Sequence, residues 1–108
     1  MSIAKGKEAE DKASSFLEAN GYIILDRNFH SKFGEIDIIA QKENILHFCE
    51  VKFSEKYDPL IQITPQKMQK IIKTIQYYFL KTRSIKDYQI DAILVKPKRI
   101  EIIKNITY

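Results

Sequence analysis

Two acidic side chains and one lysine interrupt an otherwise apolar part of the sequence, and together they could bind a metal ion and act on phosphate. Asp37 lies in the run GEIDIIA, and Glu50 and Lys52 flank Val51 in the run HFCEVK. Carboxylates can hold a hard divalent cation such as Mg²⁺, which keeps several of its waters. The cation would lower the pKa of a bound water and polarise a phosphoryl oxygen, and the lysine would position the water or stabilise charge on the phosphate. The spacing therefore indicates metal-assisted hydrolysis of a phosphodiester.

A structural ion pair is the alternative explanation of the same residues. Glu50 and Lys52 would then pair on one face of a strand, and Asp37 would be an edge residue near solvent. The spacing alone is compatible with both explanations. Two features favour the metal site: unpaired charge is costly to bury in apolar strands, and simple strand pairing does not require two acids beside a lysine.

The residues around this group predict two β-strands that form a hairpin. Residues 35–40 and 45–53 are rich in apolar side chains, and a short polar loop connects them. So short a connection favours antiparallel pairing. A register that closes on residues 42–44 places Asp37 opposite position 49 or 50, which would make Asp37 and Glu50 neighbours at one end of a sheet.

Alternation along the two strands predicts which side chains share a face. In the first strand it separates Ile36, Ile38 and Ala40 from Glu35, Asp37 and Ile39. In the second strand it separates Leu46, Phe48, Glu50 and Lys52 from Ile45, His47, Cys49, Val51 and Phe53. Both faces are mainly apolar near the middle, so we expect the sheet to be covered on both sides. Because His47 alternates with apolar residues, it is predicted to be a packed, hydrogen-bonded side chain.

Two helices and three more strands complete the predicted fold. An apolar stripe at three- and four-residue spacing predicts a helix over residues 5–20, and Thr64 with Pro65 predicts the start of a second helix. Strands are predicted over residues 22–29, 88–95 and 100–106, a mobile loop over 54–63, and basic breaks at 81–86 and 96–99. The order is α-βββ-α-ββ. Because a strand, a crossover helix and a further strand form a parallel pair, the sheet is mixed and the fold class is α/β.

Length and composition limit the class of protein. A chain of 108 residues is expected to form one domain, 1–108. Cys49, the one cysteine of the sequence, excludes an internal disulfide framework and predicts a buried, inert thiol. No apolar span suits a membrane, and no hydrophobic segment at the amino terminus suits a signal peptide. We therefore expect a cytoplasmic protein with no membrane partner.

Basic residues exceed acidic ones, which suits a polyanionic partner without establishing one. The formal net charge is +4, from 18 Lys and Arg against 14 Asp and Glu. Lys67, Lys70 and Lys73 are three residues apart on the polar side of the second helix. They could contact the phosphate backbone of a nucleic acid, and a solvated polar face is the alternative explanation.

The motifs resemble those of the YraN-like family of small bacterial proteins assigned as endonucleases. The resemblance rests on Glu10 in the first helix, the run GEIDIIA and the run EVK, and weaker matches extend over nearly the whole chain. That family in turn resembles the PD-(D/E)xK, or restriction-endonuclease-like, superfamily. The resemblance implies a single restriction-endonuclease-like domain, a mixed β-sheet flanked by helices on both faces. It also implies Asp37 and Glu50 as metal ligands, Lys52 as the catalytic lysine and Glu10 as an additional acid. Ile36 stands where the name of the superfamily has proline, and the YraN-like pattern also has an aliphatic residue there.

These observations lead to three hypotheses. The first is a nuclease that depends on Mg²⁺ or Mn²⁺ and cuts nucleic acid, with DNA favoured; its catalytic residues would be Asp37, Glu50, Lys52 and Glu10. The second is a non-catalytic nucleic-acid-binding module with the same fold, and the third is a structural or interaction protein. The intact set of acids and lysine favours the first, because a degenerate relative would be expected to lose at least one of them. A homodimer would suit an enzyme that cuts both strands of a duplex.

Overall fold

The computed structural model describes residues 3–53 and 64–106. Its elements are, in chain order, α1 (Ile3–Ala19), β1 (Ile23–His30), β2 (Glu35–Lys42), β3 (Ile45–Phe53), α2 (Pro65–Thr82), β4 (Tyr88–Val95) and β5 (Ile100–Ile103). The predicted order α-βββ-α-ββ is confirmed, although β5 is shorter than the predicted strand. The loop predicted over residues 54–63 lies outside the described residues. Within the described ranges, neither helix is long and apolar enough to cross a membrane.

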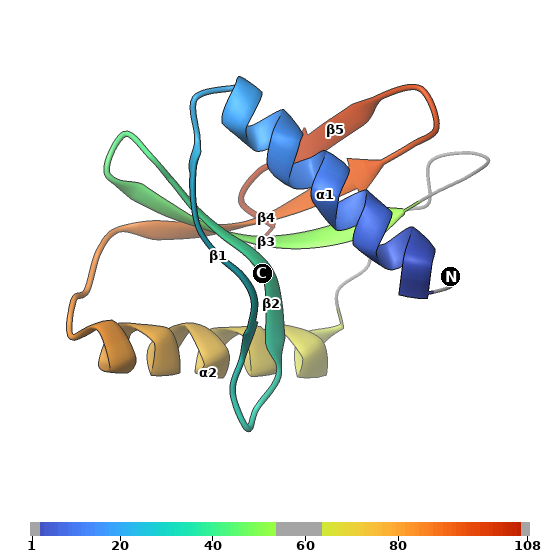
Figure 1. Cartoon of the computed structure of the whole chain (residues 1–108). Helices are drawn as coiled ribbons and strands as arrows, with labels where there is room; N and C mark the ends of the chain where they lie inside the picture. The colour runs from blue at the N-terminus through green and yellow to red at the C-terminus, as the bar shows by residue number, and fades with distance from the viewer. Residues whose placement is uncertain (1–2, 54–63, 107–108) are drawn as a thin grey trace.

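The described strands form one mixed sheet in the spatial order β1-β2-β3-β4-β5. The β3–β4 pair is parallel, and the other three neighbouring pairs are antiparallel. α2 lies between the two parallel strands in the chain, because parallel strands need a crossover connection. Figure 1 shows α1 on one face of the sheet and α2 on the other. The mixed sheet with helices on both faces is therefore confirmed.

Two apolar clusters fill the layers between the sheet and the helices. The cluster against α2 contains Phe29, Ile36, Ile39, Leu46, Phe48, Met68, Ile71, Ile75 and Ile90. The cluster against α1 contains Ala9, Ala13, Leu17, Tyr22, Ile38, Ala40, Cys49, Ile93 and Val95. In β3 the division follows the predicted alternation. Burial raises the pKa of the Cys49 thiol, so this side chain is the buried, protonated thiol that was expected.

The alternation predicted for β2 is wrong on one side of Asp37. The sequence predicts Ile36 and Ile38 on the same face, but Ile36 packs in the α2 cluster and Ile38 in the α1 cluster. Asn28 stands opposite Asp37 in the β1–β2 register and has a left-handed backbone, with φ 54. A left-handed residue interrupts the regular alternation of a strand. Figure 1 shows the tip of the β1–β2 hairpin beside α2, the helix against which Ile36 packs.

Capping groups set both ends of α2. Thr64 Oγ1 accepts a hydrogen bond from the N–H of Lys67 at 3.1 Å, and Pro65 is the first helical residue, as predicted. The helix ends at Arg83, whose φ is 55, so the basic break begins there and not at Lys81. A cation such as Lys81 in the last turn favours the longer helix, because it faces the partial negative charge of the helix end.

His47 and Asp91 form a buried polar pair between β3 and β4. His47 Nδ1 lies 2.7 Å from Asp91 Oδ2. Asp91 Oδ1 accepts hydrogen bonds from Gln89 Nε2 at 2.8 Å and from the N–H of Asn105 at 2.9 Å. Both oxygens of a buried carboxylate are thereby satisfied, as a buried charge requires. His47 is the packed, hydrogen-bonded side chain that its alternation predicts.

Asp91→Asn is expected to lower the free energy of unfolding by about 1–2 kcal/mol. The amide keeps the shape of the carboxylate but loses its charge-assisted hydrogen bonds. Urea unfolding followed by circular dichroism measures the change. Glu18→Gln, an exposed change on α1, is the control and should leave the unfolding midpoint where it is. An Asp91→Asn variant as stable as the wild type would contradict a stabilising role for this pair.

Candidate active site

Asp37 and Glu50 lie side by side where the pairing of β2 and β3 ends. The register runs through the pair Ile38–Cys49, and its next position sets Asp37 opposite Glu50. The N–H of Val51 donates a hydrogen bond to Asp37 Oδ2 at 2.8 Å, which fixes the carboxylate against β3. Of the two positions that the sequence left open, the structure therefore selects position 50.

All four residues proposed as catalytic line one cleft of about 390 Å³. The cleft lies between the first turns of α1, the ends of β2 and β3, and the first turn of α2. Its lining residues are Gly6, Ala9, Glu10, Glu35, Asp37, Glu50, Val51, Lys52 and Lys67. Both helices begin on the same side of the molecule, as Figure 1 shows, so two helix N-termini with their partial positive charge lie on the side of this cleft.

Glu50 is the most strongly perturbed acid of the cleft. Its residue surface is 6% exposed. Burial raises the pKa of Glu50 to about 7, and the negative charge of Asp37 contributes to the rise, while Lys67 and Lys52 oppose it. Lys67 Nζ lies 3.5 Å from Glu50 Oε2. A metal-free Glu50 is therefore about half protonated near neutral pH, despite two cations nearby.

Asp37 and Lys52 are shifted in the directions that burial imposes on opposite charges. Burial raises the pKa of the Asp37 carboxyl, and the charges of Glu10 and Glu35 add to the rise against the hydrogen bond from Val51. Burial also lowers the pKa of the Lys52 ammonium, and the nearby Lys67 lowers it further. Burial in this cleft thus disfavours the charged form of both the acid and the lysine, a pattern that is enriched at sites of chemistry.

The carboxylates fit a hard divalent cation. Glu50 Oε1 is buried and has no hydrogen-bond partner among the described residues, which leaves it available as a ligand. Val51 directs its N–H towards Asp37, and a residue in an extended strand directs its carbonyl to the same side. In the described parts of the chain, no three His, Cys, Asp or Glu side chains are grouped to hold a metal ion. Two carboxylates and a carbonyl with water in the other positions suit Mg²⁺ or Mn²⁺ better than Zn²⁺.

Glu10 reaches the cleft from α1, on the side opposite α2. Its Oε1 lies 3.8 Å from Arg27 Nη2, which also binds Asp11 Oδ1 at 2.7 Å. Arg27 thus ties β1 to α1, chiefly through Asp11, and lies beside Glu10. The structure therefore places Glu10 in the same cleft as the other proposed site residues. It also places Arg27 beside Glu10, a contact that the sequence alone did not predict.

Lys67 is the functional candidate whose place the sequence did not reveal. It belongs to the predicted stripe Lys67, Lys70 and Lys73, but it alone of the three lines the cleft, where it pairs with Glu50. Lys70 and Lys73 are exposed on α2 outside the cleft. The signal that could have found Lys67 is its place in the first turn of the helix that follows the run EVK.

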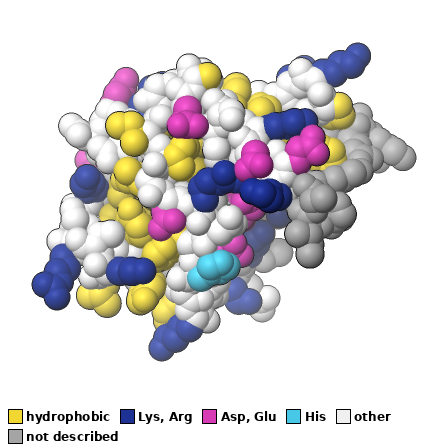
Figure 2. Space-filling view, in the orientation of Figure 1, with side chains coloured by type: hydrophobic (Ala, Val, Ile, Leu, Met, Phe, Trp, Pro, Cys, Tyr) yellow, Lys and Arg dark blue, Asp and Glu magenta, His cyan; other side chains and the backbone are white. Residues whose placement is uncertain are grey.

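Other basic groups are less available to a polyanion. Lys96 and Arg99 of the 96–99 turn lie 3.1 Å and 3.0 Å from carboxylate oxygens of Glu101. His30 lies 3.8 Å from Glu35 at the hairpin and is exposed. On the face that Figure 2 shows, Lys and Arg side chains form no single continuous basic patch, and those near its centre lie among Asp and Glu side chains.

Fold and site together define an α/β protein with carboxylates and lysines in a cleft at one end of a mixed sheet. A model of the uncharacterised protein family UPF0102 matches residues 9–95, and the chain belongs to this family. It is the YraN-like family that the runs GEIDIIA and EVK indicate, so that prediction is confirmed.

Relatives of similar length belong to the same family. A UPF0102 protein of Nitratiruptor sp. is 51% identical over 102 residues, which cover 94% of this chain and 91% of the relative. One from Helicobacter pylori (strain Shi470) is 50% identical over 97% of this chain and 92% of the relative. One from Wolinella succinogenes is 47% identical over 99% of each chain. Because the family is uncharacterised, membership adds no activity, and the function has to be argued from the site.

Proposed function

We propose that this protein is a nuclease that uses Mg²⁺ or Mn²⁺ to hydrolyse phosphodiester bonds in nucleic acid, with DNA favoured, and that its fold is restriction-endonuclease-like. The observation that carries the proposal is the cleft in which Asp37 and Glu50 adjoin Lys52. A buried carboxylate oxygen without a partner among the described residues is poorly satisfied in the metal-free protein, and a bound cation would satisfy it. The mixed sheet with a helix on each face supports the assignment of the fold.

Each residue has a role that follows from its place. When bound, the metal ion supplies an acidified water and polarises a phosphoryl oxygen. Asp37 and Glu50 hold the ion through carboxylate oxygens. Lys52 orients the attacking water or stabilises the charge that develops on phosphate, and Lys67 adds a second positive charge from α2. Glu10, which lies beside Arg27, is an additional acid that can orient water at the α1 side.

Cleavage of DNA tests the proposal directly. Duplex, single-stranded and branched DNA are incubated with the protein and Mg²⁺ or Mn²⁺. We expect cleavage by the wild type and its loss in Asp37→Ala, Glu50→Ala and Lys52→Ala, with Glu18→Ala, an exposed acid on α1, as the matched control. Activity that survives all three site substitutions would contradict the assignment of this cleft as the active site. Salt-sensitive binding of nucleic acid without cleavage of any substrate would instead support the non-catalytic module.

The affinity for Mn²⁺ is expected to rise with pH up to neutrality. Glu50 must lose its proton to bind the ion, and its pKa in the metal-free protein is raised to about 7. The apparent affinity should therefore rise by up to about tenfold per pH unit below neutrality and level off above it. Isothermal titration calorimetry in two buffers with different heats of ionisation measures both the affinity and the released proton. An affinity that stays constant from acidic to alkaline pH would show that Glu50 is not a ligand.

A further inference from the structure

Phe33 presents an aromatic ring to solvent at the turn between β1 and β2. The residue is 36% exposed. Two lysine ammonium groups lie over the ring: Lys32 Nζ is 5.2 Å and Lys73 Nζ is 5.5 Å from its centroid. Both lysines are exposed and have long, flexible side chains. An exposed ring with two cations beside it is the combination that takes a base and its neighbouring phosphates.

The turn that carries Phe33 is fixed in place. Ser31 Oγ accepts a hydrogen bond from the N–H of Phe33 at 3.0 Å and lies 2.9 Å from Thr74 Oγ1 of α2. The N–H of Ser31 donates to the carbonyl of Gly34 at 2.8 Å. Gly34 packs closely on α2, since a Cβ there would meet Thr74 Oγ1 at 3.6 Å. The ring is therefore held beside α2 before any ligand arrives, which lowers the entropy lost on binding.

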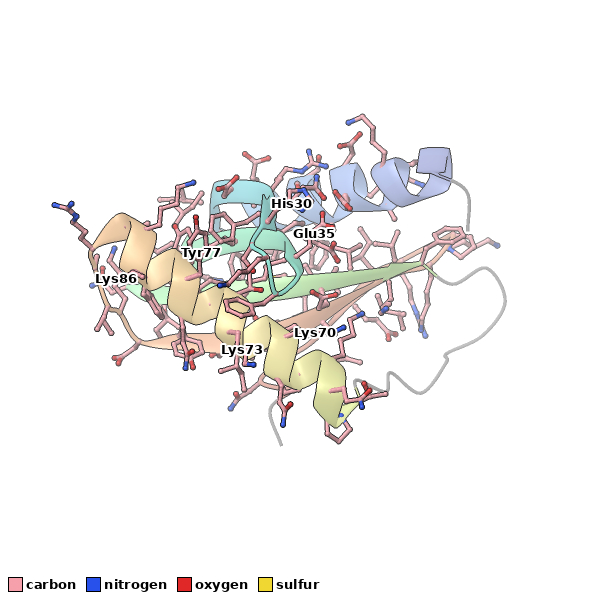
Figure 3. All side chains as sticks on the ribbon, turned by 90° about the horizontal axis from the view of Figure 1, so that it is seen from below. His30, Glu35, Lys70, Lys73, Tyr77 and Lys86 are labelled. Atoms are coloured by element: carbon pink, nitrogen blue, oxygen red, sulfur yellow. The ribbon has the colours of Figure 1, made fainter. Side chains whose placement is uncertain are left out.

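α2 carries a line of basic and aromatic side chains that starts in the cleft. Lys67 lines the cleft, and Lys70, Lys73 and Tyr77 follow at spacings of three and four residues, on one side of the helix. Tyr77 is 40% exposed and lies roughly 15 Å along the axis from Lys67, at 1.5 Å per residue. Figure 3 shows Lys70, Lys73 and Tyr77 along the near side of α2, and Lys86 beyond its far end.

We propose that Phe33, Lys70, Lys73 and Tyr77, named here the hairpin–α2 surface, bind single-stranded nucleic acid and lead it to the cleft. Bases stack on Phe33 and Tyr77, and phosphates contact Lys70 and Lys73. A base that stacks against Phe33 displaces a lysine from the ring towards the adjacent phosphate. Bases inside a duplex already have both faces stacked, so such a ring takes an unpaired base. Binding of a single strand by this surface does not depend on the proposed function. The further statement, that the cleft acts on nucleic acid with an unpaired segment, rests on the proposed function.

Binding without metal tests the surface separately from cleavage. Fluorescence anisotropy in EDTA compares a labelled oligothymidylate with a blunt-ended duplex of two complementary strands. We expect tighter binding of the single strand, weakened about 5- to 100-fold in Phe33→Ala and restored in Phe33→Trp, with the salt dependence unchanged. Lys73→Gln should reduce the slope of log affinity against log salt by about 0.7. Lys86→Gln, a matched charge change away from the surface, should leave the slope near that of the wild type.

The outcomes separate this inference from the proposed function. A preference for duplex, or binding by Phe33→Ala as tight as that of the wild type, would overturn the single-strand surface even if the protein cleaves DNA. Binding that depends on Phe33 without cleavage under Mg²⁺ or Mn²⁺ would leave the surface standing and overturn the nuclease. Phe33→Leu guards against a folding defect, because it keeps an apolar side chain at the turn and should bind as weakly as Phe33→Ala.

Discussion

Lys52→Ala is expected to cleave DNA roughly 10²- to 10³-fold more slowly than the wild type while it still binds Mn²⁺. Lys52 lies in the cleft with Asp37 and Glu50, but an ammonium group is no metal ligand. Burial lowers the pKa of Lys52, which shows that its charge is held in a partly desolvated place. There a positive charge acts on a phosphate more strongly than it would in water. Single-turnover cleavage rates at saturating Mg²⁺ measure the loss.

Lys67→Ala gives the sharpest comparison, because Lys67 is the other cation of the cleft and acts on Glu50. Lys67 lies 3.5 Å from Glu50 Oε2 and opposes the rise of its pKa. Its removal should push the pKa of Glu50 further up, so that cleavage and Mn²⁺ binding both need a higher pH. Lys52→Ala should instead be slow at every pH. Lys12→Ala, on the exposed side of α1, is the control, and Lys52→Ala cleaving at the rate of Lys12→Ala would remove Lys52 from the mechanism.

The elements that the sequence predicts well are those with strong local signals. Thr64 and Pro65 define the start of α2 by capping chemistry, which depends on neighbouring residues only. The short polar loop between β2 and β3 permits one simple connection, and from it the neighbourhood of Asp37 and Glu50 follows. The sequence could therefore predict the core of the candidate site, because the hairpin brings Asp37 and Glu50 next to each other.

The sequence did not predict how the elements pack against one another. Ile36 packs against α2 while Ile38 packs against α1, and no periodic pattern in β2 contains that information. Lys67 looks like Lys70 and Lys73 along α2, and only the packing of that helix on the sheet selects it for the cleft. Periodicity predicts the faces of an element, but which turn of a helix lies over which strand depends on the whole core.

The structure also bears on whether Glu50 belongs to a metal site or to a structural ion pair. The proposed pair was Glu50 with Lys52, yet the ion pair of Glu50 is with Lys67, at 3.5 Å and from another element. Even so, burial and Asp37 raise the pKa of Glu50. A structural ion pair would hold the acid in its charged form, whereas this acid resists ionisation in the absence of metal. Above its ordinary pKa, such an acid lowers the stability of the metal-free fold.

Glu50→Gln is therefore expected to make the metal-free protein more stable at alkaline pH. The folded protein keeps the proton of Glu50 up to about pH 7, whereas the unfolded chain releases it near the ordinary pKa of 4.5. Stability due to this group is thus full at acidic pH and is lost as pH rises through about 7. The raised pKa, which already includes the opposing effect of Lys67, corresponds to an expected gain of about 3 kcal/mol at pH well above 7.

Urea unfolding of both proteins in EDTA, at acidic and at alkaline pH, measures this gain. The two proteins should be similar at acidic pH, and Glu50→Gln should be the more stable at alkaline pH, with Glu18→Gln as the matched control. Mn²⁺ should reverse the order, because it stabilises the protein that binds it. If Glu50→Gln is instead less stable at alkaline pH and Mn²⁺ stabilises neither protein, the pair of Glu50 and Lys67 is structural. A carboxylate that binds the metal ion is expected to destabilise the metal-free protein and to stabilise the metal-bound one, whereas a structural ion pair is expected to do neither.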